Sequence, residues 1–251
     1  MALTFGSLFA GIGGIDLGFE RAGMTCLWQV EKDPFCASVL ARHWPDVHRW
    51  QDIHDVDFTA VPRVDVLAGG FPCQPVSIAG RHQGADDERW LWPEMLRAIR
   101  DLQPHAVLAE NVIGLRKRGL EEVIDGLTDI GYDTEWAPLT ACAVGFPHMR
   151  RRLFIAAYPH GSVGAKRMGH RQRPAVQAGD ENAGSANNLL DRIMASARAA
   201  GGDHDGVSGR LDAARVKALG NAVVPACAEV IGRSIAWALD GGNPHTSREA
   251  T

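Results

Sequence analysis

Cys73 lies on a turn that could present its sulfur for nucleophilic chemistry. It stands between Pro72 and Pro75 in the stretch Gly-Gly-Phe-Pro-Cys-Gln-Pro-Val-Ser-Ile-Ala-Gly, residues 69–80. Each proline fixes its own φ near about −65° and biases the preceding residue towards extended geometry, so the sulfur would point repeatedly in one direction. A lone cysteine in a tight turn is more often a buried structural residue. The surrounding glycines and prolines favour a catalytic nucleophile here.

A carboxylate and two arginines could assist such a nucleophile. Glu110 ends the apolar run 104–112, which is typical of a buried strand. A carboxyl group in an apolar crevice has a raised pKa and can act as an acid; a Glu-Asn turn that caps a helix is the alternative. Arg150 and Arg152 alternate, so in an extended segment they would share one face.

Two further acids follow a glycine turn at spacings that suit a nucleoside. The turn, Phe-Ala-Gly-Ile-Gly-Gly at 9–14, separates a predicted strand at 3–9 from a predicted helix that ends at Gly23. Glu31 follows the predicted strand 25–30, about 20 residues past the turn, where an acid can reach ribose hydroxyls. Asp52, in a predicted strand at 48–53, could accept from an adenine amine. A surface Glu that begins a helix is the other reading of Glu31.

The remaining elements must bring these residues together. We predict strands at 64–68 and 104–112, and a strand at 153–158 that closes the sheet. An amphipathic helix follows position 90, and a C-terminal helix follows Leu-Gly-Asn-Ala-Val-Val-Pro at 219–225, with Asn221 as its cap. Strands that alternate with helices predict a doubly wound α/β sheet, with the cysteine turn at the carboxyl end of a strand.

Length and composition limit the classes of protein to which this chain can belong. A length of 251 residues predicts one large domain, with or without a small appendage. The net charge of −4 argues against indiscriminate nucleic-acid binding. The 5 cysteines show no C-x-x-C spacing, so we expect no disulfide framework, no metal site and a cytoplasmic location. No apolar stretch approaches the roughly 18 residues of a membrane span.

Residues 159–214 depart from this pattern, being rich in Gly, Ala, Ser and Asn. No Asp or Glu occurs between Trp136 and Gly179, although that span carries seven basic residues. These are Arg150, Arg151, Arg152, Lys166, Arg167, Arg171 and Arg173. Such an asymmetry in an acidic protein is typical of phosphate contact. A flexible, poorly packed linker is the competing interpretation.

Six of these motifs, in this order, resemble those of DNA (cytosine-5) methyltransferases. They are the glycine turn, Glu31 with Asp52-Ile53, Pro-Cys-Gln-Pro, Glu-Asn-Val, Arg-x-Arg and Gly-Asn-Ala-Val, and they cover most of 3–157 and 215–239. The chain departs from the family pattern in two ways. His148 stands where the family has Gln before the arginines, and neither an Arg-x-Leu-Thr signature nor a full-sized recognition domain precedes Gly220.

The resemblance implies a Rossmann-like methyltransferase fold that uses S-adenosylmethionine. It implies a catalytic domain at 1–157, a small target-recognition region at 158–214, a segment that completes the catalytic domain at 215–240, and a flexible tail at 241–251. The implied catalytic residues are Cys73, Glu110, Arg150 and Arg152. The implied cofactor contacts are Phe9, Gly11, Ile12, Gly13, Glu31, Asp52, Ile53, Pro72, Leu91, Asn221, Ala222 and Val223. The implied DNA contacts are Ser77, Arg81, Lys166, Arg167, Arg171 and Arg173.

The activity implied by the resemblance is methyl transfer to carbon 5 of cytosine in double-stranded DNA. It would proceed through a covalent Cys73 adduct with a flipped base, in restriction-modification or in a phage or prophage setting. A separate restriction endonuclease is the implied partner, and we expect a monomer with no membrane association. Two alternatives stay open: a transfer RNA cytosine-5 methyltransferase, and a catalytically impaired module that binds DNA or cofactor.

Overall fold

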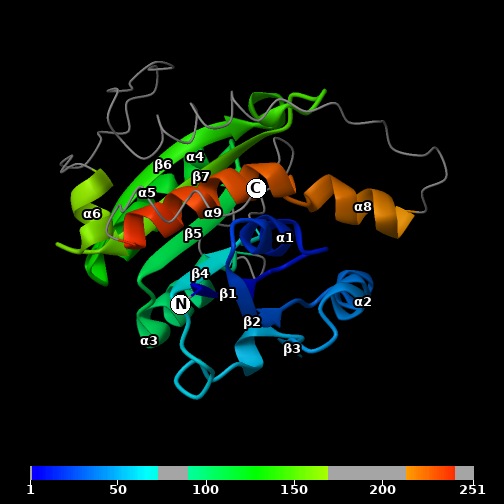
Figure 1. The fold of residues 1–251 in the computed structure, drawn as a ribbon, viewed down its shortest axis with the longest axis horizontal. Helices are drawn as coiled ribbons and strands as arrows, with labels where there is room; N and C mark the ends of the chain where they lie inside the picture. The colour runs from blue at the N-terminus through cyan, green and yellow to red at the C-terminus, as the bar shows by residue number, and fades with distance from the viewer. Residues whose placement is uncertain (1, 73–89, 169–212, 241–251) are drawn as a thin grey trace.

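The computed structural model describes residues 2–72, 90–168 and 213–240, and Figure 1 shows a central sheet flanked by helices. The strands are β1 Thr4–Leu8, β2 Thr25–Val30, β3 His48–Trp50, β4 Val66–Gly69, β5 Ala106–Val112, β6 Tyr132–Thr140 and β7 Arg151–Pro159. The helices are α1 Gly14–Arg21, α2 Pro34–His43, α3 Trp92–Leu102, α4 Leu115–Arg118, α5 Leu120–Asp129, α6 Val163–Met168, α8 Ala213–Asn221 and α9 Pro225–Leu239. Short 3-10 turns occupy Ile53–Asp55 and Ala141–Val144.

The strand order explains how distant motifs meet. The sheet runs β3-β2-β1-β4-β5-β7-β6. Strands β1 to β5 pair in parallel, whereas β7 is antiparallel to both β5 and β6. The chain winds outwards from β1 to β3 and then returns to β4 on the other side of β1. This reversal puts a crevice at the carboxyl ends of β1 and β4, where open α/β sheets bind ligands. The predicted doubly wound α/β fold is confirmed.

Apolar residues alternate between the two faces of the central strands. Val66 and Ala68 belong to a core that also contains residues of α1 and α9, whereas Leu67 packs with the core beneath α3 and α5. The predicted amphipathic helix after position 90 is α3, which buries Met95 and Ile99. Helices on both faces bury the strands, which is why the sequence shows short continuous apolar runs there.

Two predictions about the sheet need correction, and one strand was not predicted. The strand expected at 48–53 ends at Trp50, because Asp52 caps a 3-10 turn by accepting a hydrogen bond from His54 N at 3.1 Å. The strand expected at 153–158 does not close the sheet, since β7 lies between β5 and β6. Edge strand β6 was not predicted. It contains Pro138 and is mostly half-buried, and edge strands tolerate such residues.

The C-terminal helix also begins later than predicted. Asn221 is the last residue of α8 and not a cap for α9; Val224 holds the N-cap position, and Pro225 opens the helix. Proline suits the first helical position because its missing N–H would have no partner there.

Helix α9 lies beside α1 in front of the sheet (Figure 1). In the described part of the chain, one helical stretch, Lys217–Leu239, is long and apolar enough to cross a membrane by length and composition. The core helix of a soluble protein can pass the same test, and α9 buries one face against α1. The absence of a membrane span stays a prediction, which the packing of α9 supports.

Candidate active site

Glu110 is a buried carboxyl near the end of β5. Its side chain is 8 % exposed, and its Oε1 lies 3.1 Å from Arg152 Nε. Burial raises the pKa of Glu110 to about 7, against the opposing effect of the Arg152 and Arg150 charges. The group therefore changes protonation near neutral pH, which is the property that a general acid needs.

The chain that leads from β4 towards the cysteine turn passes directly beside Glu110. A Cβ at Gly70 would lie only 2.8 Å from Glu110 Oε2, so glycine allows this close approach. Asn111 Nδ2 donates to the carbonyl oxygen of Phe71 at 2.9 Å. These contacts fix the chain up to Pro72, the last residue before the gap in the described ranges. Cys73 lies outside the described residues, so its distance from Glu110 stays a prediction.

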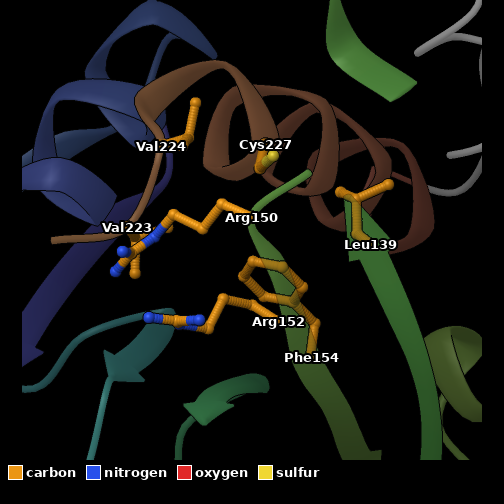
Figure 2. Close-up of a pocket in the computed structure, with 7 residues that line it drawn as sticks. All are labelled: Leu139, Arg150, Arg152, Phe154, Val223, Val224 and Cys227. Atoms are coloured by element: carbon orange, nitrogen blue, oxygen red, sulfur yellow. The ribbon is translucent and has the colours of Figure 1, made fainter. Parts of the chain in front are cut away.

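Arg150 and Arg152 line one small cavity at the start of β7. The cavity is lined by Leu139, Arg150, Arg152, Phe154, Val223, Val224 and Cys227. Figure 2 shows both arginine side chains extending away from the strand in the same direction. Arg151 is exposed, so the predicted shared face of Arg150 and Arg152 is confirmed.

Arg150 also ties the strand to the C-terminal segment. Its Nη1 donates to the carbonyl oxygen of Gly220 at 2.6 Å. Its Nε and Nη2 are buried without a hydrogen-bond partner among the described residues, and burial lowers its pKa. Two donors are therefore left for an acceptor that enters the cavity. His148, which stands where the family has Gln, is exposed, with its ring centroid 5.9 Å from that of Phe146.

The backbone of the glycine turn contacts the carboxylate of Glu31. The backbone of Phe9, Gly11 and Gly13 has positive φ, at 51°, 58° and 84°. Gly11 N donates to Glu31 Oε2 at 2.6 Å, and Asp33 N donates to Glu31 Oε1 at 2.7 Å. Burial raises the pKa of Glu31. The structure thus brings the turn and the acid together, and each carboxylate oxygen keeps a lone pair for a further donor.

Asp52 follows β3 in the same region. Its Oδ2 lies 2.6 Å from Lys32 Nζ, and this hydrogen bond lowers the pKa of Asp52. Ile53 is buried directly after it. Sequence reasoning missed Lys32 as a partner of Asp52, although its place next to Glu31 was a usable signal.

The Gly-Asn-Ala-Val segment lies against the start of α1. A Cβ at Gly14 would lie 2.2 Å from the carbonyl oxygen of Val223, so the two backbones touch. Val223 also lines the arginine cavity, which places one segment next to both the glycine turn and the arginines. The family resemblance implies that the Gly-Asn-Ala-Val segment folds back beside the glycine turn, and the contact of Val223 with Gly14 agrees with that. The contact of this segment with a cofactor stays a prediction.

Two residues of this region were not predicted from sequence. Lys217 Nζ lies 3.1 Å from Asp33 Oδ2, across 184 positions, and ties α8 to the N-cap residue of α2. Cys227 lines the arginine cavity, and burial raises the pKa of its thiol to about 12. Neither has a local sequence signal, because each contact depends on how α8 and α9 return to the sheet.

Of the predicted DNA contacts, only Lys166 and Arg167 lie among the described residues. Lys166 is exposed on α6, and Arg167 follows it in the same helix. Ser77, Arg81, Arg171 and Arg173 lie outside the described residues. Leu91, an expected cofactor contact, holds the N-cap position of α3.

Comparison with known proteins connects this geometry to one family. The model of the C-5 cytosine-specific DNA methylase family matches residues 3–200. Type II methyltransferase M.HgiBI of Herpetosiphon aurantiacus is 38% identical over 157 residues, covering 60% of this chain and 36% of its own length. Type II methyltransferase M.BanI of Aneurinibacillus aneurinilyticus is 38% identical over 177 residues, covering 66% of this chain and 40% of its own length. The chain therefore spans about two fifths of these curated relatives.

Solved structures share the fold over nearly the whole chain. A putative DNA modification methyltransferase encoded within a prophage in E. coli gives a TM-score of 0.64 at 19% identity, over 95% of this chain and 100% of that one. The methyltransferase EhMeth of Entamoeba histolytica gives a TM-score of 0.57 at 13% identity, over 95% and 98%. At these identities the likeness shows a common fold.

Proposed function

Because this chain belongs to the C-5 cytosine-specific DNA methylase family, we propose that it methylates carbon 5 of cytosine in double-stranded DNA. The proposal includes S-adenosylmethionine as the methyl donor and a flipped base as the substrate. Restriction-modification or a phage or prophage setting is the proposed context, with a separate nuclease as a partner, and with the enzyme monomeric and cytoplasmic.

The observation that carries the proposal is the Glu110–Arg152 pair at the sheet crevice. A buried carboxyl with a pKa of about 7 is protonated in part at neutral pH, and it lies 3.1 Å from a guanidinium. Cytosine presents an acceptor at ring nitrogen 3 and a carbonyl at carbon 2, side by side. A protonated carboxyl and an arginine at this spacing match those two acceptors.

The proposed reaction begins with Cys73. Carbon 5 of cytosine is too weak a nucleophile to take a methyl group directly. Addition of the Cys73 thiolate to carbon 6 moves the electrons of the 5,6 double bond onto carbon 5. Glu110 stabilises the positive charge at nitrogen 3, and Arg152, with Arg150, holds the base carbonyl. After transfer, a solvent water takes the proton from carbon 5, and the electrons of that C–H bond re-form the 5,6 double bond and expel the Cys73 thiolate from carbon 6.

Two costs must be met before this addition. A free thiol with a pKa near about 8.5 is only a few per cent ionised at neutral pH, so the site must favour the thiolate or couple attack to protonation of the base. The base must also leave the duplex, at a cost of a few kcal/mol. The positive charges of Arg150 and Arg152 would favour the thiolate form of a nearby Cys73.

The residues around the glycine turn fit S-adenosylmethionine. Gly11 has open space where a Cβ would stand, and Glu31 and Asp52 are acceptors at the ends of neighbouring strands. Glu31 would bind the ribose hydroxyls and Asp52 the adenine amine. The turn of Phe9 to Gly13, Ile53 and the segment Asn221 to Val223 would enclose the rest. When bound, the cofactor supplies an electrophilic methyl group.

The test measures methyl transfer and trapping together. Purified protein is incubated with tritium-labelled S-adenosylmethionine and duplex DNA, and bisulfite sequencing identifies the methylated cytosines. We expect incorporation by the wild type and none by Cys73→Ala, which should still bind S-adenosylmethionine. DNA with 5-fluorocytosine should trap the wild type covalently, because fluorine blocks the elimination.

Three results would overturn the proposal or part of it. Wild-type rates in Cys73→Ala would remove the covalent mechanism. Methylation of transfer RNA without methylation of DNA would assign the alternative substrate, and cofactor binding without any transfer would identify an impaired binding module.

A further inference from the structure

Asp16 is a fully buried carboxylate that the proposed reaction does not use. It lies in the first turn of α1 and is 0% exposed. Ser7 Oγ donates to its Oδ2 at 3.0 Å, and Gln29 Nε2 donates to its Oδ1 at 2.7 Å. The Cys26 thiol lies 4.0 Å from Oδ1. Burial raises the pKa of Asp16 to about 6, and the hydrogen bonds from Gln29 and Ser7 oppose the rise.

The contacts continue from Asp16 to a positive charge on β3. Arg49 donates to Gln29 Oε1 through Nε at 3.0 Å and through Nη2 at 2.6 Å. Because the Gln29 oxygen faces Arg49, its amide nitrogen must face Asp16. The Gln29 amide thus links the buried carboxylate of Asp16 to the guanidinium of Arg49, which Asp16 itself does not contact. Hydrogen bonds at both ends fix the orientation of the amide.

Each member of this network stands close to an expected cofactor contact. Ser7 precedes the glycine turn and Asp16 follows it, so their hydrogen bond joins the two ends of the turn. Gln29 is two positions before Glu31, and Arg49 is three positions before Asp52. The network therefore joins the turn to the ends of β2 and β3, the three places where the cofactor is expected.

We propose that Asp16 is a positioning residue for the cofactor site. Through Ser7, Gln29 and Arg49 it sets the glycine turn relative to Glu31 and Asp52, without contact with the ligand. A displaced turn would alter the Gly11 N to Glu31 hydrogen bond of 2.6 Å and the space beside it. This inference rests on the proposed use of S-adenosylmethionine.

The test is an exchange of amide and carboxylate between positions 16 and 29. Asp16→Ala alone leaves the Gln29 amide nitrogen and the Ser7 hydroxyl without their acceptor, and Gln29→Glu alone sets two carboxylates against each other. The double variant Asp16→Asn/Gln29→Glu restores a donor at position 16 and an acceptor at position 29, which would then pair directly with Arg49. Asp57→Asn, at an exposed carboxylate, is the matched control.

Affinity for S-adenosylhomocysteine is measured by calorimetry. We expect each single variant to bind at least about fivefold more weakly, because a buried polar group loses its partner. The double variant should recover to within about threefold of the wild type, with the control unchanged. The Michaelis constant for S-adenosylmethionine should follow these affinities, while kcat at saturating cofactor stays near the wild-type value.

Each other outcome has a definite meaning. Single variants with wild-type affinity, or a double variant as weak as the two losses combined, overturn the positioning role. If the single variants do not fold, the double variant must fold and bind, and its failure also overturns the role. A wild type that does not bind S-adenosylhomocysteine contradicts the proposed function instead.

Discussion

Glu110 has two protonation states of similar population near neutral pH, and each serves a different interaction. The neutral carboxyl can donate to a base, whereas the carboxylate pairs with Arg152 at 3.1 Å. Because burial raises the pKa to about 7 despite two nearby arginines, desolvation outweighs the attraction of the ion pair. The ionised form of Glu110 therefore destabilises the folded state, a feature that is common at functional sites.

This balance predicts how stability depends on pH. The folded pKa of Glu110, about 7, exceeds its ordinary value of 4.5, so its contribution is fully present below about pH 4.5 and is lost as pH rises through 7. Relative to Glu110→Gln, the wild type should lose roughly 3 kcal/mol of unfolding free energy over that range. Urea unfolding of both proteins at pH 4.5, 6 and 8 measures it. Parallel pH profiles for the two would contradict the raised pKa.

Glu31 allows a prediction about ligand affinity. Glu31→Ala removes the carboxylate that accepts from Gly11 N and Asp33 N, together with the expected ribose contact. We expect S-adenosylmethionine to bind more weakly by about 1.5–3 kcal/mol. Calorimetric titration gives the value, with Glu31→Gln as the control, since it keeps one acceptor oxygen and should lose less. Unchanged affinity in Glu31→Ala would show that the glycine turn binds another ligand.

The second half of α8 and the turn that leads to α9 link the arginine cavity to the glycine turn. Gly220 O accepts from Arg150, Lys217 pairs with Asp33, and Val223 O touches Gly14. Exposed ion pairs such as Lys217–Asp33 contribute little, with typical values below about 1 kcal/mol. Backbone packing at Gly14 should therefore matter more for the position of this segment.

Gly14→Ala tests that packing. The added methyl would lie 2.2 Å from the carbonyl oxygen of Val223, so α1 and the start of α9 must separate. We expect a loss of about 1–3 kcal/mol in unfolding free energy by urea denaturation, the usual cost of overpacking. Gly220→Ala is the control, because a Cβ there meets nothing within 4 Å. Equal stability of the two variants would mean that the segment adjusts without cost.

At the scale of the whole molecule, the sheet brings the described motifs together near the carboxyl ends of its parallel strands. The carboxyl ends of β1, β2 and β4 carry the glycine turn, Glu31 and the path to Cys73. Because β7 is antiparallel to β5, its start lies beside the end of β5, and Arg152 pairs with Val112 in the ladder. This reversal brings Arg152 to Glu110. In the proposed function, cofactor and base contacts occupy this end of the sheet, which leaves the choice of DNA sequence to another part of the chain.

We predict that sequence choice resides between α6 and α8. Helix α6 packs against the sheet, since Ala165 is buried and a Cβ at Gly164 would lie 2.3 Å from Tyr158. A graft of residues 169–212 from a related enzyme with another target therefore leaves α6 and the described core residues unchanged in sequence. The chimera should adopt the donor's target, a short site of about two to four base pairs. Bisulfite sequencing reads the outcome, and an active chimera that keeps the original pattern would place specificity in the catalytic domain.

The sequence by itself determined which residues could do chemistry and the order of most elements. Glycine allows the positive φ of a tight turn, so the glycine turn at 9–14 was predictable from local sequence. The cysteine turn stays a prediction, because it lies outside the described residues. Apolar runs marked β2, β4 and β5, because strands covered on both faces need apolar residues throughout. The spacing of Arg150 and Arg152 was enough to predict their shared face.

The tertiary structure alone decided which of those residues meet. No local pattern in the sequence signals the antiparallel β7 or the edge strand β6, and only the family resemblance implied the return of Val223 towards Gly14, since each depends on contacts between residues far apart in the chain. The same holds for Asp16, whose carboxylate reads in the sequence as an ordinary acid in the first turn of a helix. Its partners Ser7 and Gln29 lie on two different strands, β1 and β2, and only the packing of α1 against the sheet removes it from water.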